Sequence, residues 1–421
     1  MLEAQRAAFF AELPVSLAVR CDRLRRAALM LDQNAGALAE ALVADRATRD
    51  AESAMHDEVA PALLALEEAR AGLADGMVPA GRRGLFGLCG DMLEYQPVGV
   101  VGLMVPAALP LARAGQLLAG ALAAGNRVAL RLDVASENLG TLLGALLPRY
   151  FDPRVLVLTE DEGGFDLLVS GEPAGDDADA VPARSGKSVV ILGRSAKFVR
   201  AAGEVIAAKR VEGGRAPLAP DYMLVPAEQE EAIAAWLWRA AMQASGEGGP
   251  PLSAEACDRL TALLDDARAR GGEVMTAEPH GKGAPLHIIR HATLDMRVMR
   301  EEIAGPILPL ANYVRIEDGI AATYRLPVAP ALYYMGRDAA ERRQVMDATL
   351  SSLFAANRQM LAAVRGSSTA SDLPPPASEA EAGFRRFSRV RRICRRSWPG
   401  LGGSPGRGAA EGLSGAEPAL H

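Results

Sequence analysis

The sequence predicts an α/β protein built on a doubly wound parallel sheet, and three observations lead to that fold class. Short apolar runs such as residues 98–105 contain no charge, which is typical of strands buried on both faces of a parallel sheet. These runs alternate with segments of helical periodicity, as strands joined by crossover helices do. The length of 421 residues exceeds what one core usually supports, so we expect at least two domains.

The first 80 residues are expected to be mostly helical, and strands and helices are expected to alternate beyond them. Over residues 11–80, apolar side chains recur at three- and four-residue spacings with charges between them. Gly125 and Asn126 follow a long apolar helix and are expected to end it. The expected strands are residues 92–95, 98–105, 127–132, 155–158 and 167–169, and the expected helices are residues 111–124 and 139–147.

The second half of the chain repeats this alternation. We expect strands at residues 188–192, 273–275 and 330–334, and amphipathic helices at residues 230–244 and 254–270. Arginines gather at residues 385–396, and we interpret this cluster as a solvated face or a subunit contact. Glycine, proline, serine and alanine dominate from residue 399 onward, which predicts a disordered tail.

Composition and charge indicate a globular cytoplasmic protein. Hydrophobic residues make up 49% and charged residues 23%, and the net charge of -6 argues against a nucleic-acid partner. The four cysteines are far apart and include no C-x-x-C pair, which favours a reducing compartment and argues against disulfides. We expect neither a signal peptide nor membrane insertion, because the longest uncharged stretch, residues 95–112, contains three prolines.

Six segments, in order along the chain, carry a resemblance to one enzyme family. They are Y-Q-P-V-G-V-V-G at residues 95–102, L-A-G-A-L-A-A-G-N at 118–126, S-G-K-S at 185–188, G-G-R-A-P-L-A-P-D-Y at 213–222, M-R-V-M-R-E-E-I-A-G-P at 296–306 and D-L-P at 372–374. Any one of them is a weak signal, but six in the same order indicate a common fold. The chain resembles the aldehyde dehydrogenase superfamily over about residues 15–400, in its coniferyl-aldehyde-dehydrogenase-like (class 3-like) branch.

The resemblance implies an aldehyde dehydrogenase-like fold with a doubly wound cofactor-type domain, an α/β catalytic-type domain and an oligomerisation arm. The N-terminal helices and the cofactor-type domain are expected at residues 1–186, with an arm strand at about 88–97 and a shortened stretch near 175–186. The other expected parts are the catalytic-type domain at residues 187–365, a C-terminal arm at 366–398 and the disordered tail at 399–421. The resemblance also implies a homo-oligomer, or a hetero-oligomer with an intact paralogue.

The three groups that the family's reaction needs are missing from the matching positions. That reaction uses a cysteine thiolate as nucleophile, an asparagine amide that stabilises the oxyanion and a glutamate general base. The shared A-P-D-Y at residues 219–222 sets a register in which Pro217 replaces the cysteine. Matching residues 105–110 to the family's V-P-W-N-x-P places Ala108 at the asparagine, and counting back from S-G-K-S places Ala183 at the glutamate. None of the three side chains can act as nucleophile, donor or base, so we expect no catalytic residue.

The resemblance implies NAD or NADP as cofactor, yet the positions that would hold it are only partly kept. Gly171 begins the counterpart of the family's glycine-rich turn, but Glu172 places a carboxylate where a phosphate should approach. Only ten residues separate this turn from Gly186, where the family has a full helix and a strand, so we expect that the helix is deleted. Residual cofactor contacts are expected from Arg131, at the ribose-binding lysine, and from Glu302, at the carboxylate that holds the nicotinamide ribose. The preferred interpretation of both is structural, with Glu302 as a surface or interdomain salt-bridge residue and Arg131 as a surface cation.

Three further signals are interpreted as structural. Gly186-Lys187-Ser188 lacks the glycine that a phosphate-binding loop requires five residues earlier, because that position is Val181. The histidines have no metal-ligand spacing, so we expect no metal site. Cys257 falls on an expected helix, where we interpret it as a small apolar filler rather than a relocated nucleophile.

These observations leave three functional hypotheses. The preferred one is a pseudoenzyme that has lost NAD(P)-dependent aldehyde oxidation and serves as a scaffold, regulatory or ligand-sequestering protein. The second is an active oxidoreductase that oxidises an aromatic aldehyde to the acid with an altered site. The third is a partner subunit of an intact paralogue.

Overall fold

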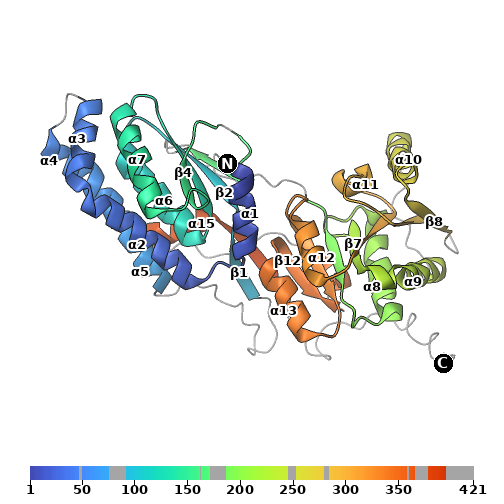
Figure 1. Cartoon of the computed structure of the whole chain (residues 1–421). Coiled ribbons are helices and arrows are strands. Elements are labelled where there is room, and N and C mark those ends of the chain that lie inside the picture. Colours follow the sequence, from blue (N-terminus) through green and yellow to red (C-terminus); the bar gives the residue numbers. More distant parts are fainter. Residues whose placement is uncertain are drawn as a thin grey trace.

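The structure is a computed structural model that describes residues 1–46, 50–74, 92–161, 163–170, 186–244, 253–278, 284–357, 360–365 and 378–394. These residues form two sheets with helices packed against them, which confirms the predicted α/β class (Figure 1). The expected tail at residues 399–421 lies outside the described residues, and so do Gly171 and Ala183. The domain boundaries expected above remain a prediction.

Helices open the chain, as the sequence predicts. They are α1 (Leu2–Glu12), α2 (Leu17–Gln33), α3 (Ala35–Asp45), α4 (Ala51–Ala54) and α5 (Ala60–Ala74), with a π-helical turn at Met55–Val59. Ser16 caps α2 by accepting a hydrogen bond from the Val19 amide at 3.3 Å. The apolar faces of these helices bury Leu24, Leu38 and Leu66 in one core with the smaller sheet.

The smaller sheet has four parallel strands in the order β4 (Leu156–Leu158), β3 (Arg127–Leu132), β2 (Val100–Val105) and β5 (Leu167–Ser170). Its crossover helices are α6 (Pro110–Ala124) and α7 (Glu137–Tyr150). Proline suits the first position of α6 because its missing N–H needs no acceptor there. Gly125 ends α6 in the left-handed conformation, with φ 91°, as the sequence predicts.

The larger sheet has nine strands, which lie in the order β1 (Met92–Pro97), β13 (Ser388–Ile393), β12 (Ser351–Ala356), β11 (Ala329–Met335), β6 (Val189–Leu192), β7 (Tyr222–Pro226), β10 (Ile307–Tyr313), β9 (Leu286–Arg290) and β8 (Glu273–Ala277). Neighbours are parallel except for the two outer pairs, β1 with β13 and β8 with β9. Val190 and Leu192 belong to one core cluster, and Val189 and Ile191 belong to another. This alternation confirms that β6 is buried on both faces.

The helices around the larger sheet are α8 (Phe198–Arg210), α9 (Glu230–Gln243), α10 (Ala254–Ala269), α11 (Arg297–Arg300), α12 (Ile316–Thr323), α13 (Ala339–Ala348) and α14 (Met360–Arg365), with 3₁₀ turns at Val211–Gly214 and Ala227–Gln229, and the chain's last described helix is α15 (Glu379–Arg386). The last helix, α15, packs against α6, while β13 joins the larger sheet. The C-terminal segment therefore connects the two halves of the molecule. Among the described helices, none is both long and apolar enough to cross a membrane.

The arginine cluster near residue 390 is not simply a solvated face. The Arg391 side chain is 1% exposed and forms an ion pair with Glu94 of β1. Its Nη1 donates hydrogen bonds to the carbonyl oxygens of Met346 at 2.7 Å and Thr349 at 3.0 Å. The interpretation of the cluster as a solvated face or subunit contact is therefore wrong for Arg391, because its charge is needed between β1 and β13.

Candidate functional site

One edge of the larger sheet gathers several of the positions that the sequence singles out. Strands β11, β6, β7 and β10 are parallel neighbours, so the segments that lead into them emerge at the same edge. Lys187 precedes β6, Pro217 lies in the loop before β7 and Glu302 lies in the segment before β10. Sheet topology thus brings together residues that are 115 positions apart in the chain, from Lys187 to Glu302.

The loop before β7 is fixed on both sides of Pro217. Glu212, Gly213 and Gly214 all have positive φ angles, which form a tight turn after α8. Leu218 is buried, and its carbonyl oxygen accepts a hydrogen bond from the Tyr333 hydroxyl at 2.8 Å. Pro217 itself is exposed. The loop therefore presents Pro217 where the resemblance places a thiol.

The loop contacts the segment that carries Glu302. A methyl group added to Gly214 would lie 2.4 Å from the carbonyl oxygen of Gly305, so the two backbones touch. Arg259 of α10 fixes the same segment by donating to the carbonyl oxygens of Glu302 at 2.6 Å and Ile303 at 2.7 Å. The Glu302 side chain is exposed, which leaves its carboxylate accessible to a ligand.

Two buried lysines lie behind this edge, and no motif of the sequence assigns a role to either. Lys187 donates from Nζ to the carbonyl oxygen of Glu301 at 2.6 Å, and burial lowers the pKa of its ammonium group to about 8. Lys209, near the end of α8, is 1% exposed, and its Nζ has no hydrogen-bond partner among the residues that the structure describes. Burial lowers the pKa of Lys209 to about 8 as well, although the Asp221 carboxylate acts in the opposite direction.

A signal for Lys209 is present in the sequence, because a lysine interrupts the apolar face of an otherwise amphipathic helix. Asp221 could not be recognised as its electrostatic partner from sequence alone, because the two residues lie on different elements. The Asp221 carboxylate also accepts a hydrogen bond from the Ser188 amide at 3.0 Å, which ties the Pro217 loop to β6. The edge is therefore charged and ordered around Pro217, the position that the resemblance assigns to the nucleophile.

The other two described positions lie on the smaller sheet. Ala108 is exposed in the turn between β2 and α6, where neighbouring Leu109 has a φ of 53°. Arg131 is half-buried on β3, and Val134 just beyond that strand is 89% exposed. The structure therefore joins Pro217 with Glu302 on one sheet and leaves Ala108 and Arg131 on the other.

The described residues do not complete a dinucleotide site. Glu302 offers an accessible carboxylate. Arg131 is not a free cation, because it already interacts with another residue of the chain. Strand β5 ends at Ser170 and the described chain resumes at Gly186, so no described helix follows β5 to receive a pyrophosphate at its N-terminus. The glycine-rich turn that the sequence predicts, which begins at Gly171, lies in the stretch between these two described segments.

Cys257 differs from its interpretation as an apolar filler. Its side chain is exposed on α10, so it does not fill a core, and that interpretation is wrong. It lies two residues before Arg259, which binds the Glu302 segment. Among the other cysteines that the structure describes, Cys21 and Cys394 are half-buried.

Comparison with known proteins defines the class to which this fold and site belong. The sequence profile of the aldehyde dehydrogenase family matches residues 1–162 and 180–368. Coniferyl aldehyde dehydrogenase from Pseudomonas sp. (strain HR199 / DSM 7063) is 32% identical over 394 residues, which cover 85% of this chain and 82% of that protein. A probable coniferyl aldehyde dehydrogenase from Caulobacter vibrioides is 30% identical, with 83% of this chain and 80% of that protein covered.

The chain therefore belongs to the aldehyde dehydrogenase family, and its resemblance to the coniferyl aldehyde dehydrogenase branch is confirmed. A solved structure of AldH from Staphylococcus aureus covers 95% of this chain and 94% of its own at 20% identity, with a TM-score of 0.41. A structure of AldC from Pseudomonas syringae, which contains NAD+ and octanal, covers 93% of this chain and 87% of its own at 21% identity, with a TM-score of 0.39. The sequence matches, rather than these structural scores, carry the assignment.

Proposed function

We propose that this member of the family has lost NAD(P)-dependent aldehyde oxidation and serves as a scaffold, regulatory or partner subunit. The observation that carries the proposal is Pro217, exposed in an ordered loop at the position of the family's nucleophilic cysteine. Proline has no thiol, and a thiolate is what attacks the aldehyde carbon in this family. The alanines assigned to positions 108 and 183 support the same conclusion, because neither side chain can donate or accept a proton.

The proposed deletion between β5 and β6 adds a second line of support. The family match breaks between residues 162 and 180, next to the stretch that the sequence predicts to be shortened. A shortened phosphate-binding helix would weaken dinucleotide binding even if another nucleophile were present. The proposal also includes a cytoplasmic location and assembly as a homo-oligomer or as a hetero-oligomer with an intact paralogue.

The test is an assay of NAD(P)H formation by the full-length chain, with aromatic and aliphatic aldehydes and with NAD and NADP in turn. The Pseudomonas sp. coniferyl aldehyde dehydrogenase, assayed in parallel, is the positive control. We expect no turnover above the buffer rate, and calorimetry should detect no saturable binding of either cofactor. Saturable turnover that scales with the concentration of this chain would refute the proposal.

The second candidate is an active oxidoreductase that oxidises an aromatic aldehyde with an altered site. Exposed Cys257 favours it, because α10 also carries Arg259, which binds the segment of Glu302. If the parallel assay shows turnover, Cys257→Ser should abolish it under this hypothesis, and Pro217→Ala should leave it unchanged. Turnover that survives Cys257→Ser would exclude Cys257 as the nucleophile.

A further inference from the structure

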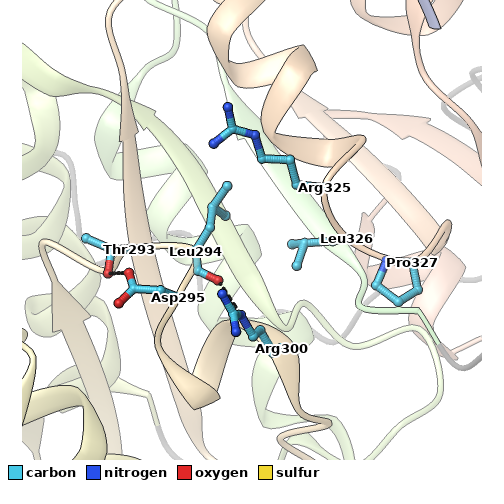
Figure 2. A pocket seen from close by; sticks show the side chains of 7 residues that line it. All are labelled: Thr293, Leu294, Asp295, Arg300, Arg325, Leu326 and Pro327. Atoms are coloured by element: carbon cyan, nitrogen blue, oxygen red, sulfur yellow. Dashed lines mark hydrogen bonds between the residues drawn. The ribbon is translucent and has the colours of Figure 1, made fainter. Parts of the chain in front are cut away.

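A pocket of about 590 Å³ lies between two segments that flank strands of the larger sheet (Figure 2). Thr293, Leu294, Asp295 and Arg300 come from the connection between β9 and β10, and Arg325, Leu326 and Pro327 come from the connection between α12 and β11. This volume falls within the range of pockets that hold small organic molecules. None of its lining residues matches a catalytic or cofactor position that the family resemblance assigns.

The charged side chains of the pocket differ in how far they are already paired. Arg325 makes no ion pair or side-chain hydrogen bond within the described part of the chain. The Arg300 Nε donates to the carbonyl oxygen of Leu294 at 3.0 Å, which fixes the side chain while its two terminal nitrogens have no acceptor among the described residues. Asp295 is already satisfied, since it accepts hydrogen bonds from Thr293 at 2.5 Å and from Arg270 at 2.9 Å. Because Arg270 already pairs with Asp295, the guanidinium groups of Arg300 and Arg325 are the charges of the lining that remain to meet an anion.

The wall between the two arginines is apolar. Leu294 and Leu326 lie between Arg325 at one end of the pocket and Arg300 at the other, and Pro327 lies beside Leu326 (Figure 2). Leu294 and Leu326 are half-buried, so each keeps hydrocarbon surface that a ligand could cover. A guanidinium group offers a planar fork of donors that matches a carboxylate.

We propose that this pocket binds a small monocarboxylate with an apolar body. The carboxylate pairs with a free arginine fork, and the hydrocarbon part covers Leu294 and Leu326. Inorganic phosphate fits less well, because it has no apolar part that could cover Leu294 and Leu326. The inference goes beyond the proposed loss of oxidation and does not depend on it, because none of these residues takes part in the family's chemistry.

The test measures binding of benzoate to the full-length chain by saturation-transfer NMR at low salt. Benzamide, which has the same shape and no charge, and inorganic phosphate are the comparison ligands. We expect saturable benzoate binding, with benzamide and phosphate each at least about tenfold weaker, as for the loss of a charged hydrogen bond or of apolar contact.

Arg325→Gln is the decisive variant, because the Arg325 side chain makes no ion pair or hydrogen bond with any described residue. It should weaken benzoate binding about tenfold without changing the unfolding midpoint. Arg342→Gln is the matched control, since Arg342 is also an exposed arginine, on α13, whose guanidinium makes no contact within the described residues. It removes the same charge and should leave benzoate binding unchanged.

Three results would overturn the inference. They are no saturable benzoate binding, binding that Arg325→Gln and Arg342→Gln weaken equally, and phosphate binding as strong as that of benzoate. The second result would indicate a general effect of net charge, and the third would indicate a surface that attracts any anion.

Discussion

The turn around Asn126 and the loop around Pro217 both match motifs of the family. They differ in whether the side chain at the centre of the motif makes buried hydrogen bonds. Asn126 is completely buried and makes four hydrogen bonds through its side chain. Its Oδ1 accepts from the amides of Val98 at 2.7 Å and Gly99 at 3.0 Å, and its Nδ2 donates to the carbonyl oxygens of Ala121 at 3.1 Å and Phe387 at 2.9 Å. The Pro217 loop has buried neighbours and a hydrogen bond to the segment before β6, but it carries a proline where the resemblance places a reactive cysteine.

The difference separates residues that hold the fold from residues that perform chemistry. Asn126 joins β2, α6 and the C-terminal segment, so replacing it would leave buried polar groups unpaired. Pro217 is exposed, and no comparable structural requirement acts on its side chain. A chain under selection for its scaffold alone would lose the second kind of residue first.

The largest expected effect tests the structural side of this comparison. Asn126→Ala leaves the amides of Val98 and Gly99 and the carbonyl group of Phe387 without the side chain that pairs with them, so the free energy of unfolding should fall by about 4 kcal/mol or more. Pro217→Ala should change it by no more than about 1 kcal/mol, because the side chain is exposed. Urea denaturation monitored by circular dichroism measures both. Equal effects of the two substitutions would show that the buried turn is not the more demanding region.

The contact between the Pro217 loop and the Glu302 segment gives the next largest effect. Gly214 has a φ of 85°, and a methyl group there would lie 2.4 Å from the carbonyl oxygen of Gly305. Gly214→Ala should therefore lower the free energy of unfolding by about 3 kcal/mol. Gly203→Ala is the control, because a methyl group at this position of α8 meets nothing within 4 Å. It should raise stability by about 0.5–1 kcal/mol, since alanine favours a helix.

Much of the scaffold could be predicted from the sequence, because the relevant signals are local. The apolar run at residues 98–105 and the glycine at position 125 identify β2 and the end of α6 without reference to the rest of the chain. The role of Arg391 could not be predicted, because its partner Glu94 lies 297 positions away in the sequence. From sequence alone, a run of charged residues on a strand is interpreted as exposed to solvent, because the sequence does not show which strand pairs with it.

In the candidate site, too, local motifs could be predicted from the sequence and long-range contacts could not. The motif register identified Pro217 and Glu302, but only the parallel order of β6, β7 and β10 shows that they share an edge with Lys187 and Lys209. The exposure of Cys257 could not be predicted either, because α10 contributes leucines to the core from other faces. The sequence therefore predicts which residues occupy the family's site positions. It does not predict which of them are buried or close together, because that depends on contacts between elements far apart in the chain.

Buried Lys209 gives a smaller, pH-dependent effect at the same edge. Its pKa is about 8 in the folded chain and 10.5 in its ordinary state, so below pH 8 the ammonium group is charged in both the folded and the unfolded chain. Between pH 8 and 10.5 only the unfolded chain keeps the proton. The free energy of unfolding should therefore rise with pH across this window, by up to about 3 kcal/mol from Lys209.

Lys209→Met removes this contribution. At pH 7 the variant should be more stable than the wild-type chain by about 2–3 kcal/mol, because it buries no charge, and the difference should shrink toward pH 10. Urea denaturation at pH 7, 8.5 and 10 measures the difference, and Lys197→Met, at an exposed lysine before α8, is the control. A difference that stays constant with pH would show that Lys209 does not change its protonation in this range.

The smallest expected effect concerns the chemical side of the comparison, where restoring the lost groups should restore no activity. The triple variant Pro217→Cys, Ala183→Glu and Ala108→Asn returns a nucleophile, a base and an oxyanion donor to the family positions. A thiohemiacetal can pass its hydride on only if a nicotinamide is held beside it, and we expect the helix that would bind the pyrophosphate to be deleted. We therefore expect no NAD(P)H formation, while thiol titration should detect one more accessible cysteine than in the wild-type chain, because position 217 is exposed. NAD(P)H formation by this variant would mean that the cofactor site is intact and that the loss of function is confined to three side chains.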